Sequence, residues 1–350
     1  MAANTLLYLI PSLVASLVPT LLYVWLVWRL DRYEKEPAHL LVAAFVWGAV
    51  PAVILSVILE LAFETPLAAL GSAYTQLISS SVITPPIEEA FKALALLGLA
   101  RWARREFDGL LDGIIYGSIV GLGFAFTENI FYFVGTWHEG DLHSWGLVVL
   151  TRTLAFGLNH AMYTSFTGAA LGLARHQATR SRRTALLLAG LALAIAAHAV
   201  HNGLLATNTL CWFSLAADWG GVLVILALTI VAWGRERAIM RTHLTPEVTN
   251  GLLSQQQFDM VVSRRRRWRQ SFRLLGLEGV EQTRDWRRLV ATATELAFVQ
   301  HHATTDADPK LAERGAQLRE IVATLRDRIA AFPAAAVSKE APPKEPPAAV

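Results

Sequence analysis

Long apolar runs recur through roughly the first two thirds of the chain and are separated by short polar connections. A transmembrane helix needs about 20 mainly apolar residues, because inside the hydrocarbon only the helix itself satisfies the backbone hydrogen-bonding groups. Seven stretches meet this requirement: 5–28, 39–63, 77–100, 109–133, 147–173, 184–206 and 219–234. The pattern therefore predicts an all-α polytopic membrane protein with about seven transmembrane helices.

The third of these stretches contains two consecutive prolines, Pro85 and Pro86. Proline inside a helix removes a backbone hydrogen bond and clashes with the preceding turn, but the first turn of a helix accommodates it well. The sequence therefore predicts either a kinked helix over 77–100 or a regular helix that begins at the two prolines.

Lysine and arginine are distributed unevenly among the connections. The connections after the first, third, fifth and seventh stretches contain Arg29, Arg32 and Lys35; Arg101, Arg104 and Arg105; Arg175, Arg180, Arg182 and Arg183; and Arg235, Arg237 and Arg241. The connections 64–76, 134–146 and 207–218 contain neither residue type. Because basic loops stay on the cytoplasmic side of a membrane, we predict that the N-terminus lies outside and the C-terminal region lies in the cytoplasm.

The composition agrees with a membrane protein and divides the chain into regions. Hydrophobic residues make up 54% of the sequence and charged residues 17%, which is more apolar than typical soluble domains. The single cysteine, Cys211, excludes a disulfide framework and a cysteine-rich metal cluster. We predict a transmembrane domain over 1–241, a mostly helical cytoplasmic region over 242–332 and a disordered Pro/Ala-rich tail over 333–350.

The formal net charge of +3 arises after residue 243, because residues 1–243 contain 15 basic and 15 acidic residues. The segment 264–273 reads RRRRWRQSFR and follows soon after the last predicted transmembrane helix. Basic segments beside a membrane attract anionic lipid headgroups, so we predict that partner at the cytoplasmic face. A solvated helix face is the alternative, and we do not expect nucleic-acid binding.

Ionisable and strongly polar residues occur inside several predicted transmembrane helices. Placing a charged residue deep in a bilayer costs about 2.5 kcal/mol or more, so each one requires a compensating role. The residues concerned are Glu88, Glu89 and Lys92; Asp108, Asp112 and Glu128; Arg152, Asn159 and His160; and His198, His201 and Asn202. Their density predicts a functional site within the membrane domain.

Helical spacing indicates which of these residues face one another. Small residues recur four positions apart on one face of the fourth predicted helix, at Gly113, Gly117 and Gly121. Such a face lets a neighbouring helix approach closely, and Glu128 lies about 20° from it. His160 in the fifth helix, and His198 and Asn202 in the sixth, lie on similar faces. We therefore expect these residues to converge in the outer half of the membrane.

The converging side chains suit metal-assisted hydrolysis of a peptide bond. A catalytic zinc ion typically has about three protein ligands and leaves a fourth position for water. The ligands expected here are Glu128, His160 and His198. Glu88 or Glu89 would then accept the proton of the attacking water.

The same residues also allow hydrolysis without a metal. A glutamate would activate water directly, while His198 and Asn202 would donate hydrogen bonds to the developing oxyanion. The residue types leave both mechanisms open. In either case, we predict that the catalytic residues include Glu88, Glu89, His198 and Asn202.

The remaining polar residues fit structural roles better. Lys92 lies four residues after Glu88, which places the two side chains on one helix face as an ion pair. His201 is expected to lie off the face that carries His198. A structural network or helix cap is expected for Asp108, Asp112 and Arg152.

Several segments together resemble the motifs of the PrsW family of intramembrane proteases, which are distant relatives of the CAAX prenyl-protein endopeptidases. These segments are Glu88-Glu89-x-x-Lys92, Asp112 to Gly117, Gly121 to Asn129, Arg152 to Tyr163, His198-x-x-x-Asn202 and the turn Asp31-Arg32-Tyr33-Glu34. The resemblance covers about residues 5–235. It implies a multi-pass protease of the bacterial cytoplasmic membrane, often described as a metalloprotease, that cleaves membrane-anchored regulators such as anti-sigma factors. The CAAX relatives carry histidine where this sequence has Glu128.

Two other classes of membrane protein are alternatives to a protease. A transporter also places charged residues at mid-membrane, but it commonly shows inverted repeats and paired broken helices, and only the 77–100 stretch looks broken in the sequence. A non-catalytic sensor or scaffold would explain the basic segment at 264–273. It would give no role to Glu88 and Glu89, so an intramembrane endopeptidase is the leading hypothesis.

Overall fold

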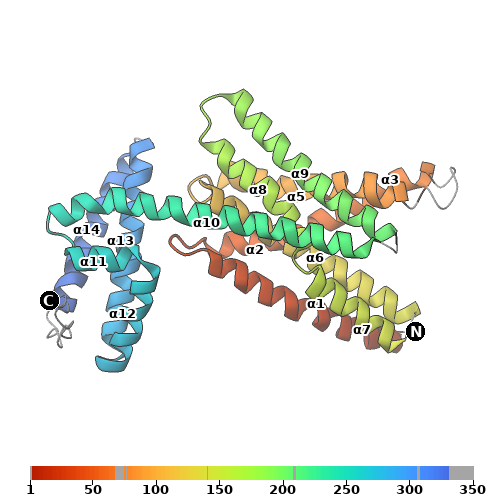
Figure 1. Cartoon of the computed structure of the whole chain (residues 1–350), viewed down its shortest axis with the longest axis horizontal. Helices are drawn as coiled ribbons and strands as arrows, with labels where there is room; N and C mark the ends of the chain where they lie inside the picture. Colours follow the sequence, from red (N-terminus) through yellow and green to blue (C-terminus); the bar gives the residue numbers. More distant parts are fainter. Residues whose placement is uncertain are drawn as a thin grey trace, which may run out of the picture. The chain divides into compact units, whose positions relative to one another are not determined.

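The structure is a computed structural model that describes residues 2–67, 75, 77–139, 141–207, 210–305 and 308–330 (Figure 1). Every regular element in these ranges is helical, as the apolar pattern predicted. The chain divides into two compact units, Met1–Gly234 and Arg235–Val350. The predicted disordered tail at 333–350 lies outside the described residues.

The first unit is built from long α-helices and short π-helical segments. Its α-helices are α1 (Ala2–Leu30), α2 (Ala38–Trp47), α3 (Val53–Leu67), α5 (Thr84–Trp102), α6 (Leu110–Glu139), α7 (Leu142–Leu150), α8 (Asn159–Arg175), α9 (Arg180–Ala206) and the first part of α10 (Cys211–Thr249). The π-helical segments are η1 (Gly48–Ala52), η3 (Ser79–Ile83) and η4 (Thr151–Ala155). Such segments are frequent at functional sites.

Within the described residues, five helical segments are long and apolar enough to cross a membrane: Leu9–Leu30, Ala38–Phe63, Leu110–Trp137, Arg180–Ala206 and Cys211–Thr249. They correspond to the first, second, fourth, sixth and seventh predicted helices. The other two predicted stretches are built differently, because 77–100 is rich in charge after Thr84 and 147–173 is divided into shorter pieces. The count of seven therefore stays a prediction.

The third predicted stretch, 77–100, contains a regular helix that begins at the two prolines, which is one of the two arrangements predicted for it. α5 begins at Thr84 and has Pro85 and Pro86 in its first turn, directly after η3. The first backbone N–H groups of a helix have no partner within the helix, so proline removes no hydrogen bond at this position. The two prolines therefore begin a regular helix instead of kinking one.

The fifth predicted stretch is not continuous, so the expectation that only 77–100 is broken was wrong. η4 ends at Ala155, and α8 starts at Asn159. Between them, a Cβ atom on Gly157 would lie 2.1 Å from the carbonyl oxygen of Thr153. Only glycine fits such a close approach of backbone to backbone. This tight turn lies immediately before His160.

α6 packs closely against α8 through the glycine face predicted from the sequence. Cβ atoms added to Gly113, Gly117 and Gly121 would lie 2.1, 2.7 and 2.2 Å from the carbonyl oxygens of Gly168, Thr164 and His160, respectively. A larger side chain at any of these glycines would push the two helices apart. The prediction of a close helix contact on this face is confirmed, and the contact places His160 beside α6.

The first unit buries polar residues and exposes large apolar ones. Its outer surface includes Val18, Ile58, Leu188 and Leu223. Large exposed apolar surfaces are unusual on soluble proteins but match the hydrocarbon of a bilayer. The surface of this unit therefore agrees with the membrane protein predicted from its hydropathy.

The second unit is a helical bundle with a conventional apolar core. It contains the end of α10 followed by α11 (Gln255–Val262), α12 (Arg264–Leu277), α13 (Val280–Thr305) and α14 (Pro309–Ala330). A capping box formed by Ser254 and Gln257 begins α11. Side chains fully buried in this core include Trp286, Leu289, Leu296 and Val322.

Candidate active site

Two consecutive carboxylates lie in the second turn of α5, just after the break between η3 and α5. Both Glu88 and Glu89 are buried, and Lys92, one turn later, is completely buried. Buried charges require compensation by partners of opposite charge. The start of α5 therefore places two acids and a base together inside the unit.

Lys92 joins residues from two helices. Its ammonium nitrogen donates to Glu88 Oε2 at 3.0 Å, to Glu89 Oε1 at 2.9 Å and to His160 Nδ1 at 3.0 Å. The ammonium also lies 3.7 Å from the centroid of the Phe124 ring, where a cation–π interaction adds to its stabilisation. The predicted ion pair with Glu88 is confirmed, whereas the contacts with Glu89 and His160 were not predicted.

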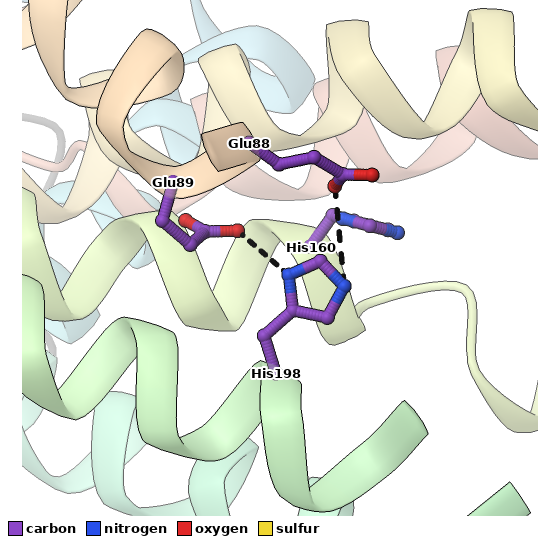
Figure 2. A group of neighbouring side chains, drawn as sticks. All are labelled: Glu88, Glu89, His160 and His198. Carbon is purple, nitrogen blue, oxygen red and sulfur yellow. Dashed lines mark hydrogen bonds and ion pairs between the residues drawn. The ribbon is translucent and has the colours of Figure 1, made fainter. Parts of the chain in front are cut away.

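His198 on α9 lies between the two glutamates, as Figure 2 shows. Its Nδ1 atom is 3.1 Å from Glu89 Oε1, and its Nε2 atom is 3.9 Å from Glu88 Oε2. The second oxygen of Glu89 accepts a hydrogen bond from the Thr164 hydroxyl at 3.2 Å. Helices α5, α8 and α9 therefore contribute to one polar cluster.

Four residues of this cluster form a group of donors suited to a metal ion. Glu88, Glu89, His160 and His198 each offer one oxygen or nitrogen atom, and these atoms all lie within 4.8 Å of one another. Carboxylate oxygen and imidazole nitrogen are the ligand types of catalytic zinc sites. The chemistry of the donor set thus fits a divalent metal ion, although the Lys92 ammonium shares three of the same side chains.

Glu128, which we expected to be a metal ligand, is not part of this donor group. Its Oε2 atom lies 2.8 Å from His160 Nε2 and 2.9 Å from a guanidinium nitrogen of Arg152. Arg152 in turn donates to the side-chain oxygen of Asn129 at 2.7 Å. Glu128 therefore contacts the nitrogen of His160 opposite the one that faces Lys92.

Asn202, which we expected to stabilise an oxyanion, donates to the backbone carbonyl of Ser80 in η3 at 2.7 Å. This bond connects α9 to the segment that precedes α5. Asp112 accepts hydrogen bonds from the backbone N–H groups of Asp108 and Gly109 at 2.9 and 2.6 Å. It thus occupies a capping position at the start of α6, in line with the structural role expected for it.

Sequence analysis missed a neighbouring polar network around Asp218 on α10. Asp218 lies 2.6 Å from His201 Nδ1 and accepts from the Tyr163 hydroxyl at 3.1 Å. Asp218 falls one position before the last stretch predicted to be transmembrane, so it was not counted among the polar residues of the helices. An ionisable residue directly beside an apolar stretch was the available signal.

Comparisons with known proteins relate the chain to one family of membrane proteases. A sequence profile described as "PrsW family intramembrane metalloprotease" matches residues 36–233. "Protease PrsW" of Bacillus subtilis (strain 168) is 31% identical over 152 residues, which cover 43% of this chain and 63% of that protein, so the match spans less than two thirds of that relative. Proteins of the same name from Clostridioides difficile (strain 630) and Geobacillus kaustophilus (strain HTA426) are 25% and 28% identical, over 62% and 60% of this chain and 85% and 82% of their own lengths. No solved structure matches the chain significantly.

Proposed function

Because the chain belongs to the PrsW family of intramembrane metalloproteases, we propose that it is an endopeptidase that hydrolyses a peptide bond of another membrane-anchored protein. The observation that carries this proposal is the buried group of two glutamates and two histidines from α5, α8 and α9. A purely structural ion pair with Lys92 would need only one of the carboxylates. Carboxylate and imidazole groups are the side chains that hold a catalytic metal ion and activate water in metal-assisted peptide hydrolysis.

The residues proposed to hold a divalent metal ion are His160, His198 and Glu89. When bound there, a metal such as zinc supplies Lewis-acid chemistry for the hydrolysis. We assign Glu88 as the general base, because it is the remaining carboxylate of the donor group and its contacts with Lys92 and His198 both involve Oε2. Glu88 would accept the proton of the attacking water and later donate it to the leaving amine.

Glu128 orients His160 in this proposal. Metal-binding histidines commonly donate their other ring N–H to a carboxylate, which fixes the tautomer and the direction of the ring. Glu128 is placed for this role, since it contacts His160 Nε2 while Nδ1 faces the donor group. Arg152 holds the Glu128 carboxylate from the other side. The expected metal ligand thus becomes a supporting residue.

A mechanism without a metal is the second candidate, and the position of Lys92 favours it. The ammonium lies within about 3 Å of Glu88, Glu89 and His160, so it already supplies positive charge among the proposed ligands. In that mechanism a glutamate activates water and His198 donates to the oxyanion. The two mechanisms differ in their dependence on metal, which makes them separable.

The deciding experiment measures bound metal and cleavage of a single-span, anti-sigma-factor-like substrate with purified protein in nanodiscs. If metal is required, His198→Ala loses metal and activity together, whereas Glu88→Gln keeps metal and loses roughly 100-fold in rate. If it is not required, chelators leave cleavage unchanged and His198→Ala slows it roughly 100-fold to 1,000-fold. His143→Ala and Glu106→Gln, which alter exposed residues outside the cluster, serve as matched controls. Full activity in His198→Ala and in the double Glu88→Gln, Glu89→Gln variant would remove the site assignment.

We also propose that the N-terminus lies outside the cytoplasm and the second unit inside it, as the distribution of basic residues predicts. The exposed residues His143 and Arg180 lie in connections of opposite predicted location. In a background without Cys211, the one cysteine of the chain, His143→Cys should react with an impermeant thiol reagent in intact cells. Arg180→Cys should react only after permeabilisation, and the reverse pattern would contradict this topology.

Anionic lipid is the partner that we propose for α12. Trp268, Phe272 and Leu275 follow one another at helical spacing and are 53%, 59% and 46% exposed, although large apolar residues are normally buried in a soluble unit. Arginines surround them at positions 264–267, 269 and 273. A helix with an apolar stripe and a basic polar face is typical of one that lies at the surface of a membrane.

A further inference from the structure

A buried polar network lies beside the two histidines of the candidate site, on the side of α10. Asp218 lies at its centre, His201 comes from α9, and Tyr163 and Asn159 come from α8. All four residues are buried, and Tyr163 is completely so. An unpaired charge in such a place costs several kcal/mol, so the contacts of Asp218 show what it stabilises.

One route leads from Asp218 to His198. The Tyr163 hydroxyl donates to Asp218 Oδ1 at 3.1 Å. The ring of Tyr163 stacks on the imidazole of His198, with the ring centroids 4.8 Å apart and the planes only 13° from parallel. Because Asp218 fixes the hydroxyl end of the tyrosine, it also fixes the surface against which His198 lies.

A second route leads from Asp218 to His160. His201 Nδ1 is 2.6 Å from Asp218 Oδ2, and its Nε2 is 3.4 Å from the side-chain nitrogen of Asn159. The side-chain oxygen of Asn159 accepts the backbone N–H of His160 at 2.7 Å. The donors and acceptors are consistent throughout: a carboxylate requires N–H at Nδ1, which leaves Nε2 to accept from the amide. One carboxylate thus orders both routes.

Ser214 raises the possibility of a second nucleophilic site, which the geometry excludes. Its hydroxyl lies 3.0 Å from His201 Nδ1, the same nitrogen that contacts Asp218. A serine nucleophile needs the imidazole nitrogen opposite the one bound by the acid, and here that nitrogen faces Asn159. The network is therefore built for orientation and not for attack on a substrate.

α10 is held in register with the rest of the site. The Trp219 indole donates to the backbone carbonyl of Ala155 in η4 at 3.1 Å. Beside it, a Cβ atom on Gly221 would lie 2.7 Å from the sulfur of Met162, so the two helices touch at that point. These contacts leave Asp218 little freedom to shift relative to α8.

We propose that Asp218 is a positioning residue that holds His198 through Tyr163 and His160 through His201 and Asn159. This inference rests on the proposed protease function but assigns Asp218 no contact with substrate or metal. A misplacement of about 1 Å of a reacting group can cost about 100-fold in rate. The chain offers a matched control, because the Tyr116 hydroxyl donates to the buried carboxyl of Glu36 at 2.5 Å, away from the site.

The control also joins a buried tyrosine to a buried carboxyl group, but the carboxyl group of Glu36 is neutral, whereas Asp218 is taken as a charged carboxylate. Burial, together with the nearby charge of Asp112, raises the pKa of the Glu36 carboxyl to about 11, so Tyr116→Phe removes a tyrosine–carboxyl hydrogen bond without uncovering a charge. Tyr163→Phe removes the corresponding bond beside His198 and keeps the stacked ring. Comparing the two variants separates positioning from the general loss of a buried hydrogen bond.

The test measures kcat, KM and thermal unfolding of the full chain in nanodiscs, together with side-chain ¹⁵N signals of His198 and His160. Asp218→Asn should lower kcat about 100-fold with little change in KM, and Tyr163→Phe should lower it less. The double variant should be no slower than Asp218→Asn, because Asp218→Asn already interrupts the route that runs through Tyr163. The ¹⁵N signals of His198 should shift in Tyr163→Phe and stay unchanged in Tyr116→Phe.

Several outcomes would overturn the proposal. It fails if kcat and the His198 signals are unchanged in Asp218→Asn, or if Tyr116→Phe lowers kcat as much as Tyr163→Phe. If Asp218→Asn does not fold, Tyr163→Phe alone decides, through the His198 signals. If the wild type cleaves no substrate, the protease proposal fails, while the histidine signals still test the positioning role.

Discussion

The two units of the molecule distribute apolar and charged residues in opposite ways. The first unit exposes large apolar residues such as Ile58 and buries Glu89 and Lys92, whereas the second unit buries Trp286 and Leu289. Several ion pairs of the second unit lie at its surface, as between Arg314 and Glu295, which are 45% and 46% exposed. One chain therefore contains a unit suited to lipid and a unit suited to water. An ion pair of the same kind contributes a different free energy in each unit.

The difference in burial between these ion pairs indicates which of them serve a function. Water stabilises an exposed charged group whether or not its ion-pair partner is present, so loss of an exposed pair costs about 0–1 kcal/mol. A buried pair leaves an uncompensated charge when one partner is removed, at a cost of about 3–5 kcal/mol. Two buried glutamates and a buried lysine on one helix carry such a cost, and this cost indicates a functional role for them.

Removing the cation from one ion pair in each unit should give the largest difference between the two units. Lys92→Met should lower the free energy of unfolding by about 3–5 kcal/mol, and Arg314→Met by about 1 kcal/mol or less. Chemical unfolding in detergent, followed by circular dichroism, measures both. Added zinc should restore part of the loss in Lys92→Met, since a divalent ion would replace the missing charge and stabilise the folded state that binds it.

Equal small losses in the two variants would show that the buried charges of the first unit are not energetically distinct. Loss without any rescue by zinc or other divalent ions would instead favour the mechanism in which Lys92 supplies the positive charge. Arg319→Met, which leaves the buried Glu247 without one of its partners, tests whether a large cost follows burial in the second unit too.

A second prediction concerns a buried carboxylate that supports a site residue. Glu128→Gln keeps the shape of the side chain but weakens the orientation of His160, and such changes typically cost about 10-fold to 100-fold in metal affinity or activity. Cleavage rate and metal titration measure the two quantities separately. Glu106→Gln, an exposed acid of the same unit, should change neither. An unchanged cleavage rate and metal affinity in Glu128→Gln would show that His160 does not depend on Glu128 for its orientation.

The smallest expected effect concerns α12, where the second unit departs from its own pattern by exposing apolar residues. A solvent-sensitive fluorophore at Phe272→Cys, in a Cys211→Ala background, should shift to the blue in nanodiscs of anionic lipid and not in neutral ones. Each arginine removed, for example in Arg269→Gln, should weaken the interaction by about 1 kcal/mol, and salt should weaken it further.

The same fluorophore at the exposed position Ile321→Cys on α14 provides the control for α12 and should not respond to lipid charge. A response of both labels would indicate adsorption of the whole unit instead of a specific surface. A shift of the Phe272→Cys label that is the same in neutral and anionic nanodiscs would contradict a role for the arginines.

Local patterns in the sequence determined much of this protein. Apolar runs identified the helices because every backbone group within a bilayer must be satisfied inside the helix. Pro85 and Pro86 limited the third stretch to a kinked helix or a helix that begins there, and the close contact between α6 and α8 followed from three glycines at helical spacing. These features depend on residues less than about three turns apart, so spacing alone reveals them.

Only the tertiary structure decided which polar residues of different helices meet. The break at Gly157 interrupts the helix just before His160, so helical spacing across 147–173 could not relate that side chain to the residues before the break. The tertiary structure places Glu128 against His160 Nε2 instead of among the metal donors. It also brings Lys92 to His160 and Asp218 to Tyr163 from different helices. Such contacts depend on how separate helices are placed and rotated against one another, because each helix fixes only which of its own residues share a face.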